Sequence, residues 1–172
     1  STTFGNASHR SCSKQGPMPW RNVTKVEAEA ACLAAGRRLC TETEWQMSCG
    51  NGSMTQKFPY GNAYDADACN GRDVDLNCAG GDTDELAATG DNFVCPDIPG
   101  GATQCEPGGG GSVDMSGNLR EWTSTPIGGG FRVKGGGYDN IDEGLKCTLS
   151  FIAFTQNTAF PNLGFRCCGD AP

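Results

Sequence analysis

Histidine is almost absent from this sequence of 172 residues, because His9 is the only one. A serine–histidine–acid triad, a metal face of two histidines and a multi-histidine iron site each require a histidine with suitable partners. His9 lies in a polar segment rich in Ser, Thr and Asn, and we interpret it as a surface residue. We therefore expect no catalytic site based on histidine.

Basic residues and long hydrophobic runs are scarce as well. The 13 Lys and Arg residues stand against 20 Asp and Glu, which gives a net charge near −7. Such a chain has no basic field to hold a phosphate backbone, so we expect no nucleic-acid partner. No stretch approaches the roughly 20 apolar residues that cross a bilayer, so we expect no membrane span. The length predicts a single domain with one core.

Cysteine, in contrast, is abundant, with 11 residues in the chain. Proteins of reducing compartments rarely carry so many cysteines unless they bind metal, and no CxxC pair repeats here at zinc-ligand spacing. The composition therefore predicts a disulfide framework in a secreted protein that works outside the cell or at its surface. Because the number is odd, one thiol is free or bridges to another molecule.

Two capping boxes predict two consecutive helices. The first helix is expected over residues 24–36, opened by Thr24 and Glu27 and ended by a glycine. Its apolar stripe is predicted to contain Val26, Ala30, Leu33 and Ala34. The second helix is expected over residues 41–50, opened by Thr41 and Glu44.

The remainder of the chain shows turn signals and short strands. Glycine-rich turns fill residues 50–111, a length of loop that requires disulfides or bound ions to hold it. Strands are predicted at 131–133, 145–155 and 164–168, and the core at Trp45, Trp122, Phe165 and the apolar run 151–154. Residues 1–20 lack periodicity and are predicted to form an N-terminal arm before a domain at 21–172.

Several motifs in a fixed order carry a resemblance to a known family. They are GRRLCTETEW (36–45), FPYGN (58–62), DMSGNLREW (114–122), RVKGGGY (132–138) and NLGFRCC (162–168). Together they resemble the formylglycine-generating enzyme family, also called the sulfatase-modifying-factor domain, and its secreted, cysteine-rich bacterial members. The resemblance covers about residues 23–169. It implies an α+β, C-type-lectin-like fold with two helices, short antiparallel strands and long irregular loops tied by disulfides.

The same resemblance bears on catalysis. In the family, a GGSY segment is followed by cysteines two and seven residues after the Tyr, and this thiol pair binds copper and oxidises a substrate cysteine. Counted from Tyr138, these positions hold Asn140 and Leu145, and a shift of one residue in either direction brings no cysteine there. Cu(I) requires thiolate or thioether ligands. The family branch that forms sulfur–carbon bonds with iron needs a histidine-bearing partner domain. We therefore expect no catalytic residues and no enzyme activity.

The resemblance further implies two structural calcium ions as the only cofactor. The first ligand set is Asp114, Gly117, Leu119 and Glu121, and the second is Asn70, Gly71, Asp91 and Phe93. Carboxylates and carbonyls of tight turns are ligands that Ca²⁺ prefers. The alternative is that Asp114 and Glu121 only cap turns.

Disulfide pairs are likewise implied by the resemblance, since spacing alone decides none of them. The family pattern pairs Cys32 with Cys167 and Cys49 with Cys147. Cys40 and Cys168 are additional to this pattern, and we expect them and Cys12 to share one further bridge.

These observations lead to three hypotheses of function. The first is a secreted, non-catalytic binding or adhesive module, stabilised by calcium and disulfides, that assembles with copies of itself or contacts a cell-surface ligand. The second is a structural subunit of a surface filament or assembly. The third is an enzyme of the formylglycine-generating type with a changed site.

Overall fold

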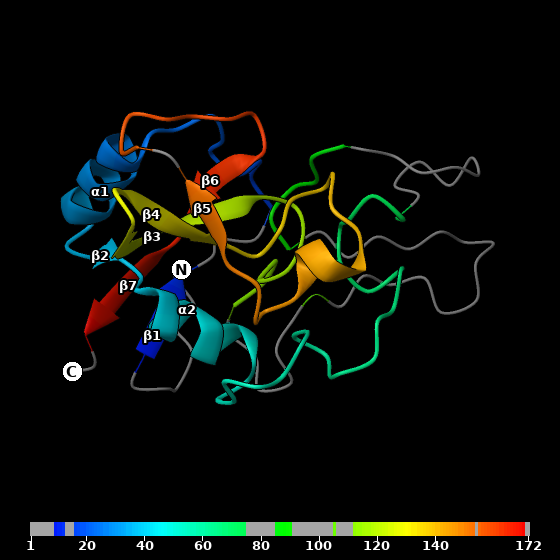
Figure 1. The fold of residues 1–172 in the computed structure, drawn as a ribbon. Coiled ribbons are helices and arrows are strands. Elements are labelled where there is room, and N and C mark those ends of the chain that lie inside the picture. Colours follow the sequence, from blue (N-terminus) through cyan, green and yellow to red (C-terminus); the bar gives the residue numbers. More distant parts are fainter. Residues whose placement is uncertain are drawn as a thin grey trace.

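Two small sheets and two helices lie on one side of the molecule, and described loops, among them residues 50–74, lie on the other (Figure 1). The computed structural model describes residues 9–12, 16–74, 85–90, 105, 112–153 and 155–170. The helices are α1 (Lys25–Ala34), α2 (Glu42–Cys49) and the 3-10 helix η1 (Asp142–Leu145). The strands are β1 (His9–Cys12), β2 (Arg38–Leu39), β3 (Arg120–Ile127), β4 (Gly130–Lys134), β5 (Phe151–Ala153), β6 (Leu163–Phe165) and β7 (Cys167–Asp170). None of these described helices is long and apolar enough to span a membrane.

The chain passes from one sheet to the other near its C-terminal end. The four-stranded sheet has the order β5-β4-β3-β6, with β3 and β6 parallel and the other pairs antiparallel. The three-stranded sheet has the order β1-β7-β2 and is antiparallel. Only Arg166 separates β6 from β7, so this residue lies at the junction of the two sheets.

Both predicted helices are confirmed, with both capping boxes formed. The Thr24 hydroxyl accepts a hydrogen bond from the Glu27 backbone N–H at the start of α1, and Thr41 and Glu44 repeat this arrangement at the start of α2. In each box the glutamate also accepts a bond from the backbone N–H of the capping threonine. These reciprocal bonds satisfy N–H groups that no helical carbonyl reaches.

The predicted apolar stripe of α1 is wrong. Val26 is 45% exposed and Leu33 75% exposed, and Ala30 and Ala34 are exposed too. The buried face instead carries Lys25, Ala28 and Cys32. This face is joined to β7 by the Cys32–Cys167 disulfide, and its Ala28 packs in the hydrophobic core.

The strand predictions are partly confirmed. Strand β4 extends the segment predicted at 131–133, and β6 and β7 replace the single strand predicted at 164–168. Within 145–155 only β5 is a strand, and its Ile152 is 63% exposed, which contradicts its predicted place in the core. The longest strand, β3, was not predicted, because its sequence REWTSTPI has neither a clean alternation nor a long apolar run.

Two buried clusters make up most of the core. The first contains Trp122 and joins α1 to the four-stranded sheet; its buried members are Val23, Ala28, Cys32, Leu39, Trp122, Val133 and Leu163. The second surrounds Trp45 and is rich in sulfur; it contains Cys40, Trp45, Cys49, Met115, Cys147 and Cys168. Both tryptophans are fully buried, as predicted.

Four disulfides lie within the described part of the chain, three of them inside the two core clusters. Cys32–Cys167 and Cys49–Cys147 are present, as the family pattern implied, and they join α1 and α2 to the C-terminal part of the chain. The further bridge is Cys40–Cys168. A fourth, Cys69–Cys105, holds the long loops. The side chain of Cys12 lies outside the described residues, as do Cys78 and Cys95.

Part of the predicted N-terminal arm belongs to a sheet of the same chain. Residues His9–Cys12 form β1, which pairs with β7 from His9 opposite Asp170 to Cys12 opposite Cys167. Farther along, Gly16 donates a backbone hydrogen bond to Thr89, and Thr89 donates one to Pro17. The described part of the arm is thus folded back on its own domain.

Candidate functional site

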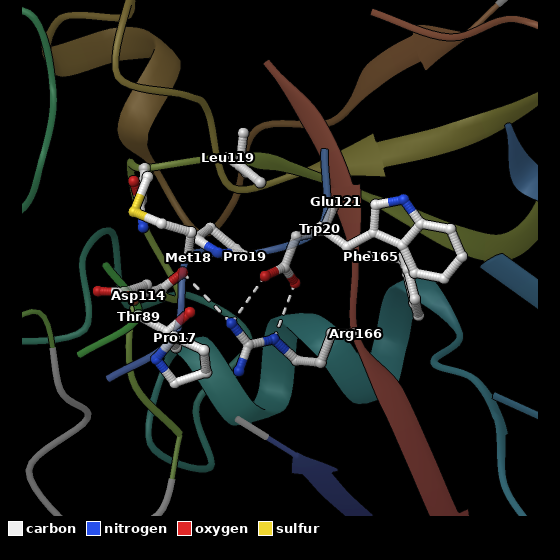
Figure 2. Close-up of a pocket in the computed structure, with 11 residues that line it drawn as sticks. Pro17, Met18, Pro19, Trp20, Thr89, Asp114, Leu119, Glu121, Phe165 and Arg166 are labelled. Atoms are coloured by element: carbon white, nitrogen blue, oxygen red, sulfur yellow. Dashed lines mark hydrogen bonds and ion pairs between the residues drawn. The ribbon is translucent and has the colours of Figure 1, made fainter. Parts of the chain in front are cut away.

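A pocket of about 240 Å³ opens beside the junction of the two sheets (Figure 2). Its wall is formed by residues 17–20, which we call the strap, and by Phe165 of β6. Residues at the start of β3 and in the loop before it contribute the other side. The full lining is Pro17, Met18, Pro19, Trp20, Thr89, Asp114, Asn118, Leu119, Glu121, Phe165 and Arg166.

A buried ion pair forms one side of the pocket. Arg166 Nε lies 2.8 Å from Glu121 Oε2, and Arg166 Nη2 lies 2.7 Å from Glu121 Oε1. Trp45 Nε1 donates a further hydrogen bond of 2.7 Å to Glu121 Oε2. Arg166 is 4% exposed and Glu121 7%, so both charges are buried. The two-point contact between them compensates each charge inside the protein.

The strap supplies apolar and aromatic surface. Trp20 packs edge-to-face on Phe165, with ring centroids 5.6 Å apart, and Figure 2 shows the two rings side by side. Trp20 is 56% exposed and Met18 58%, so the strap presents large apolar side chains to solvent as well as to the pocket. Pro17 and Pro19 each precede one of these side chains and restrict the backbone of the strap.

Asp114 is the second acidic residue of the pocket. It adopts a left-handed backbone conformation with φ +54°, and its Oδ2 accepts a 2.7 Å hydrogen bond from the Gly90 N–H. Burial raises the pKa of this carboxyl group, an effect opposed by the Gly90 bond and by the charge of Arg166. Arg166 Nη2 also donates to the backbone oxygens of Val113, at 2.9 Å, and Asp114, at 3.3 Å.

The structure brings most of the first predicted calcium set together. Asp114, Leu119 and Glu121 line the pocket, and Gly117 lies in the turn between them. However, both oxygens of Glu121 already accept hydrogen bonds from Arg166 or Trp45. No group of three or more His, Cys, Asp or Glu side chains within the described part of the chain is arranged to hold a metal ion. The first ligand set therefore fits calcium poorly, and a calcium ion bound by it stays a prediction.

The second predicted set is described only in part, because Asp91 and Phe93 lie outside the described residues. Asn70 is 6% exposed, and its Oδ1 is a buried acceptor without a hydrogen-bond partner. Its Nδ2 donates to Glu85 O at 3.0 Å and to Asn118 Oδ1 at 3.1 Å. These two bonds fix the orientation of the amide group, with the nitrogen toward the two acceptors and Oδ1 on the other side. An oxygen held in this way suits a hard cation.

Glycine at position 117 lets the pocket loop approach the Asn70 loop. A Cβ at Gly117 would lie 2.4 Å from the Asn70 carbonyl oxygen, and the residue has φ +76°. The following Asn118 donates its backbone N–H to the same carbonyl at 2.7 Å. The two predicted calcium loops are therefore packed directly against each other.

The positions compared with the catalytic thiols are not among the described residues that line this pocket. Asn140 Oδ1 accepts bonds from Arg120 Nε at 3.1 Å, from Arg120 Nη2 at 3.0 Å and from the Gly137 N–H at 2.9 Å. Leu145 is 2% exposed and ends η1. At these two positions the protein has an amide oxygen that accepts three hydrogen bonds and a leucine that packs in the core, and both stabilise the fold.

Sequence reasoning missed the pocket itself. Arg166 was part of a quoted motif, but nothing in the sequence indicated that it pairs with Glu121, 45 residues away. The strap carried one usable signal, which is the alternation of two prolines with Met18 and Trp20 in an otherwise polar segment.

Comparisons with known sequences agree with the motifs. A family profile described as "Sulfatase-modifying factor enzyme 1-like domain" matches residues 3–171. The chain is 30% identical over 177 residues to formylglycine-generating enzyme of Mus musculus, covering 88% of this chain and 44% of the enzyme. It is 29% identical over 163 residues to inactive C-alpha-formylglycine-generating enzyme 2 of the same species, covering 90% and 50%. The chain thus spans about half the length of these curated relatives.

Solved structures show the same fold at low sequence identity. Treponema denticola variable protein 1 superposes with a TM-score of 0.68 at 12% identity, covering 98% of this chain and 91% of that chain. The P3c variant of Major Tropism Determinant superposes with a TM-score of 0.58 at 15% identity, covering 94% and 45%. These likenesses confirm the C-type-lectin-like fold.

Proposed function

This chain belongs to the sulfatase-modifying factor enzyme 1-like family, and within it we propose a secreted, non-catalytic binding module in place of an oxidase. The observation that carries the proposal is that Asn140 is hydrogen-bonded to Arg120 and Leu145 is buried in the core, at the two positions compared with the catalytic thiols. A copper-binding thiol pair cannot form from an amide bound to Arg120 and a leucine in the core. A relative named inactive, at 29% identity, supports the same reading.

Binding is supported by the form of the surface. The name Major Tropism Determinant describes a protein that determines tropism, and its fold is shared with this chain. Here the fold displays exposed apolar side chains on loops and strand edges, among them Trp20 and Ile152. Rigid scaffolds with side chains displayed on loops are suited to recognition. The four described disulfides support an oxidising, extracellular location.

We further propose a calcium ion at the Asn70 loop. The unpartnered Oδ1 of Asn70 and the carbonyl of Gly71 are the described members of the predicted ligand set, and Asp91 and Phe93 are the other two. A bound ion would satisfy the buried amide oxygen and would hold a long loop that the Cys69–Cys105 bridge closes on one side.

The test of the non-catalytic proposal is an oxidation assay. The purified protein, supplied with copper and oxygen, is incubated with a cysteine-containing sulfatase peptide, and the loss of the cysteine thiol is followed by mass spectrometry. We expect turnover equal to that of copper alone. Mouse formylglycine-generating enzyme in the same assay is the positive control. Turnover above the copper blank that Asn140→Ala or Arg120→Ala reduces would overturn the proposal.

A further inference from the structure

We propose that the pocket beneath the strap binds an alkylammonium group, of the kind that ends a lysine side chain, and is where this module contacts its partner. The inference rests on the proposed binding function, whose ligand class it names. Three features of the described structure carry it: the charge of the pocket, its apolar walls and its size.

The described residues that line the pocket carry two carboxylates, Asp114 and Glu121, and one guanidinium group, Arg166, a formal charge of −1. Arg166 and Glu121 compensate each other through a two-point contact, whereas Asp114 takes part in no ion pair within the described residues. The Asp114 side chain is only partly buried and lines the pocket, so a ligand can reach it. The chain as a whole has a net charge near −7, which favours the approach of cations.

The walls select an organic cation over a metal ion. Ca²⁺ takes six to eight oxygen ligands. Around this pocket, Pro17, Met18, Leu119 and Phe165 offer carbon surface instead. An alkyl chain packs on such surface, and the exposed ring of Trp20 provides an aromatic edge or face for the ammonium group.

The polar groups suit an ammonium head. A lysine ammonium group has three donors and requires acceptors. Asp114 provides the charged acceptor and Thr89 a neutral hydroxyl in the same lining. Ligand pockets for drug-sized molecules are about 300–1,000 Å³. At about 240 Å³ this pocket is suited to one side chain.

The experiment measures Trp20 fluorescence during titration of the full chain. Of the three tryptophans, Trp20 lines the pocket whereas Trp45 and Trp122 are buried, so a ligand in the pocket contacts Trp20 directly. The probes are Nα-acetyl-lysine N-methylamide and its norleucine analogue, which lacks the ammonium group. We expect saturable binding of the lysine probe and at least tenfold weaker binding of the norleucine probe.

Asp114→Asn is the decisive variant. Asparagine tolerates the φ of +54° at this position and keeps an oxygen for the Gly90 N–H, so the fold is retained while the charge is lost. We expect at least tenfold weaker binding of the lysine probe by this variant. Asp67→Asn, which makes the same charge change on an exposed loop residue, should bind like the wild type.

The outcomes separate the alternatives. Equal binding of both probes, unchanged binding by Asp114→Asn, or no saturable binding would overturn the inference. Submillimolar CaCl₂ that displaces the lysine probe would assign the pocket to calcium and overturn it as well. If a lysine-containing peptide binds more tightly than n-pentylamine, the ligand is a lysine side chain of a protein. If the two bind equally, the ligand is a free amine. Both results support the ammonium site. Failure here leaves the oxidation assay, and with it the non-catalytic proposal, unaffected.

Discussion

At the scale of single residues, Arg166 and Asn70 show how buried polar groups shape this protein. Arg166 neutralises Glu121 and also holds the backbone of residues 113–114, so one guanidinium group joins β3, the sheet junction and the pocket loop. Removing one member of such a pair leaves an uncompensated buried charge, at a cost of about 3–5 kcal/mol. Asn70 differs, because its Oδ1 has no partner.

The Asn70 site makes a prediction about calcium. Chelation should lower the melting temperature of the wild type, since an ion that binds only the folded state adds about 2.7 kcal/mol at a hundredfold excess over Kd. We expect Asn70→Ala to lose most of the difference between calcium and chelator in differential scanning calorimetry. Asn62→Ala, at an exposed loop position, should keep it.

Asp114→Ala tests the first predicted set in the same experiment. We expect a calcium response close to that of the wild type, because Glu121 is occupied by Arg166 and Trp45. An identical melting curve with and without chelator in the wild type would contradict calcium at either loop.

At the scale of elements, the start of α2 combines helix capping with tertiary contact. Glu44 closes the capping box with Thr41, and its two carboxylate oxygens also pair with Arg38 of β2, at 2.7 Å and 2.6 Å. The Arg38 hydrogen bond and the Thr41 bonds together lower the pKa of Glu44 from 4.5 to about 2, although burial opposes them. The charged form of Glu44 therefore stabilises the fold.

This pKa predicts a pH dependence of stability. Because the folded pKa is depressed, the stabilisation is fully present above pH 4.5 and is lost as the pH falls toward 2. We expect Glu44→Gln to reduce the free energy of unfolding by about 2 kcal/mol at pH 7 and by almost nothing near pH 2, measured by denaturant unfolding with the disulfides intact.

Glu27→Gln is the matched control for Glu44, since it occupies the same position in the capping box of α1. Its carboxylate lies on the surface, where solvent screens the interaction, so we expect a much smaller pH-dependent difference. A Glu44→Gln effect of the same size at pH 7 and pH 2 would contradict the role of the charge.

At the scale of the whole molecule, the disulfides and the first strand connect the two ends of the chain. Three bridges span 135, 128 and 98 residues, and in the chain-entropy model each contributes about 4–5 kcal/mol by restricting the unfolded state. Strand β1 pairs with β7, so the two ends also meet within one sheet. The four described bridges use eight of the 11 cysteines, which leaves an odd number.

The odd cysteine leads to a prediction about native size. We expect an assembly larger than the 18.0 kDa monomer, held in part by one thiol among Cys12, Cys78 and Cys95. Light scattering after size-exclusion chromatography, with and without reductant, measures this directly. One of three single Cys→Ser variants should remove the reductant-sensitive species. A full-length protein that elutes as an 18.0 kDa monomer without reductant would contradict the assembly.

The sequence by itself determined the helices, the family and the two disulfides implied by it. Capping boxes are local, since Thr24 and Glu27 need only each other. The order of the family motifs can likewise be recognised in the sequence without knowing which residues are in contact. The C-type-lectin-like fold followed from those motifs. The rotation of α1 did not, because its buried face carries Lys25, Ala28 and the bridged Cys32 and not the predicted apolar stripe.

Tertiary structure alone decided the pocket. Its members come from the strap, the loop before β3 and the junction of β6 and β7, segments that are far apart in the sequence. Whether Glu121 binds a metal ion or an arginine depends on which cation the fold brings to it, and the sheet junction brings Arg166. A sequence specifies the carboxylate, but only the packed chain specifies its partner, because the electrostatic energy of a buried charge depends on its neighbours in space.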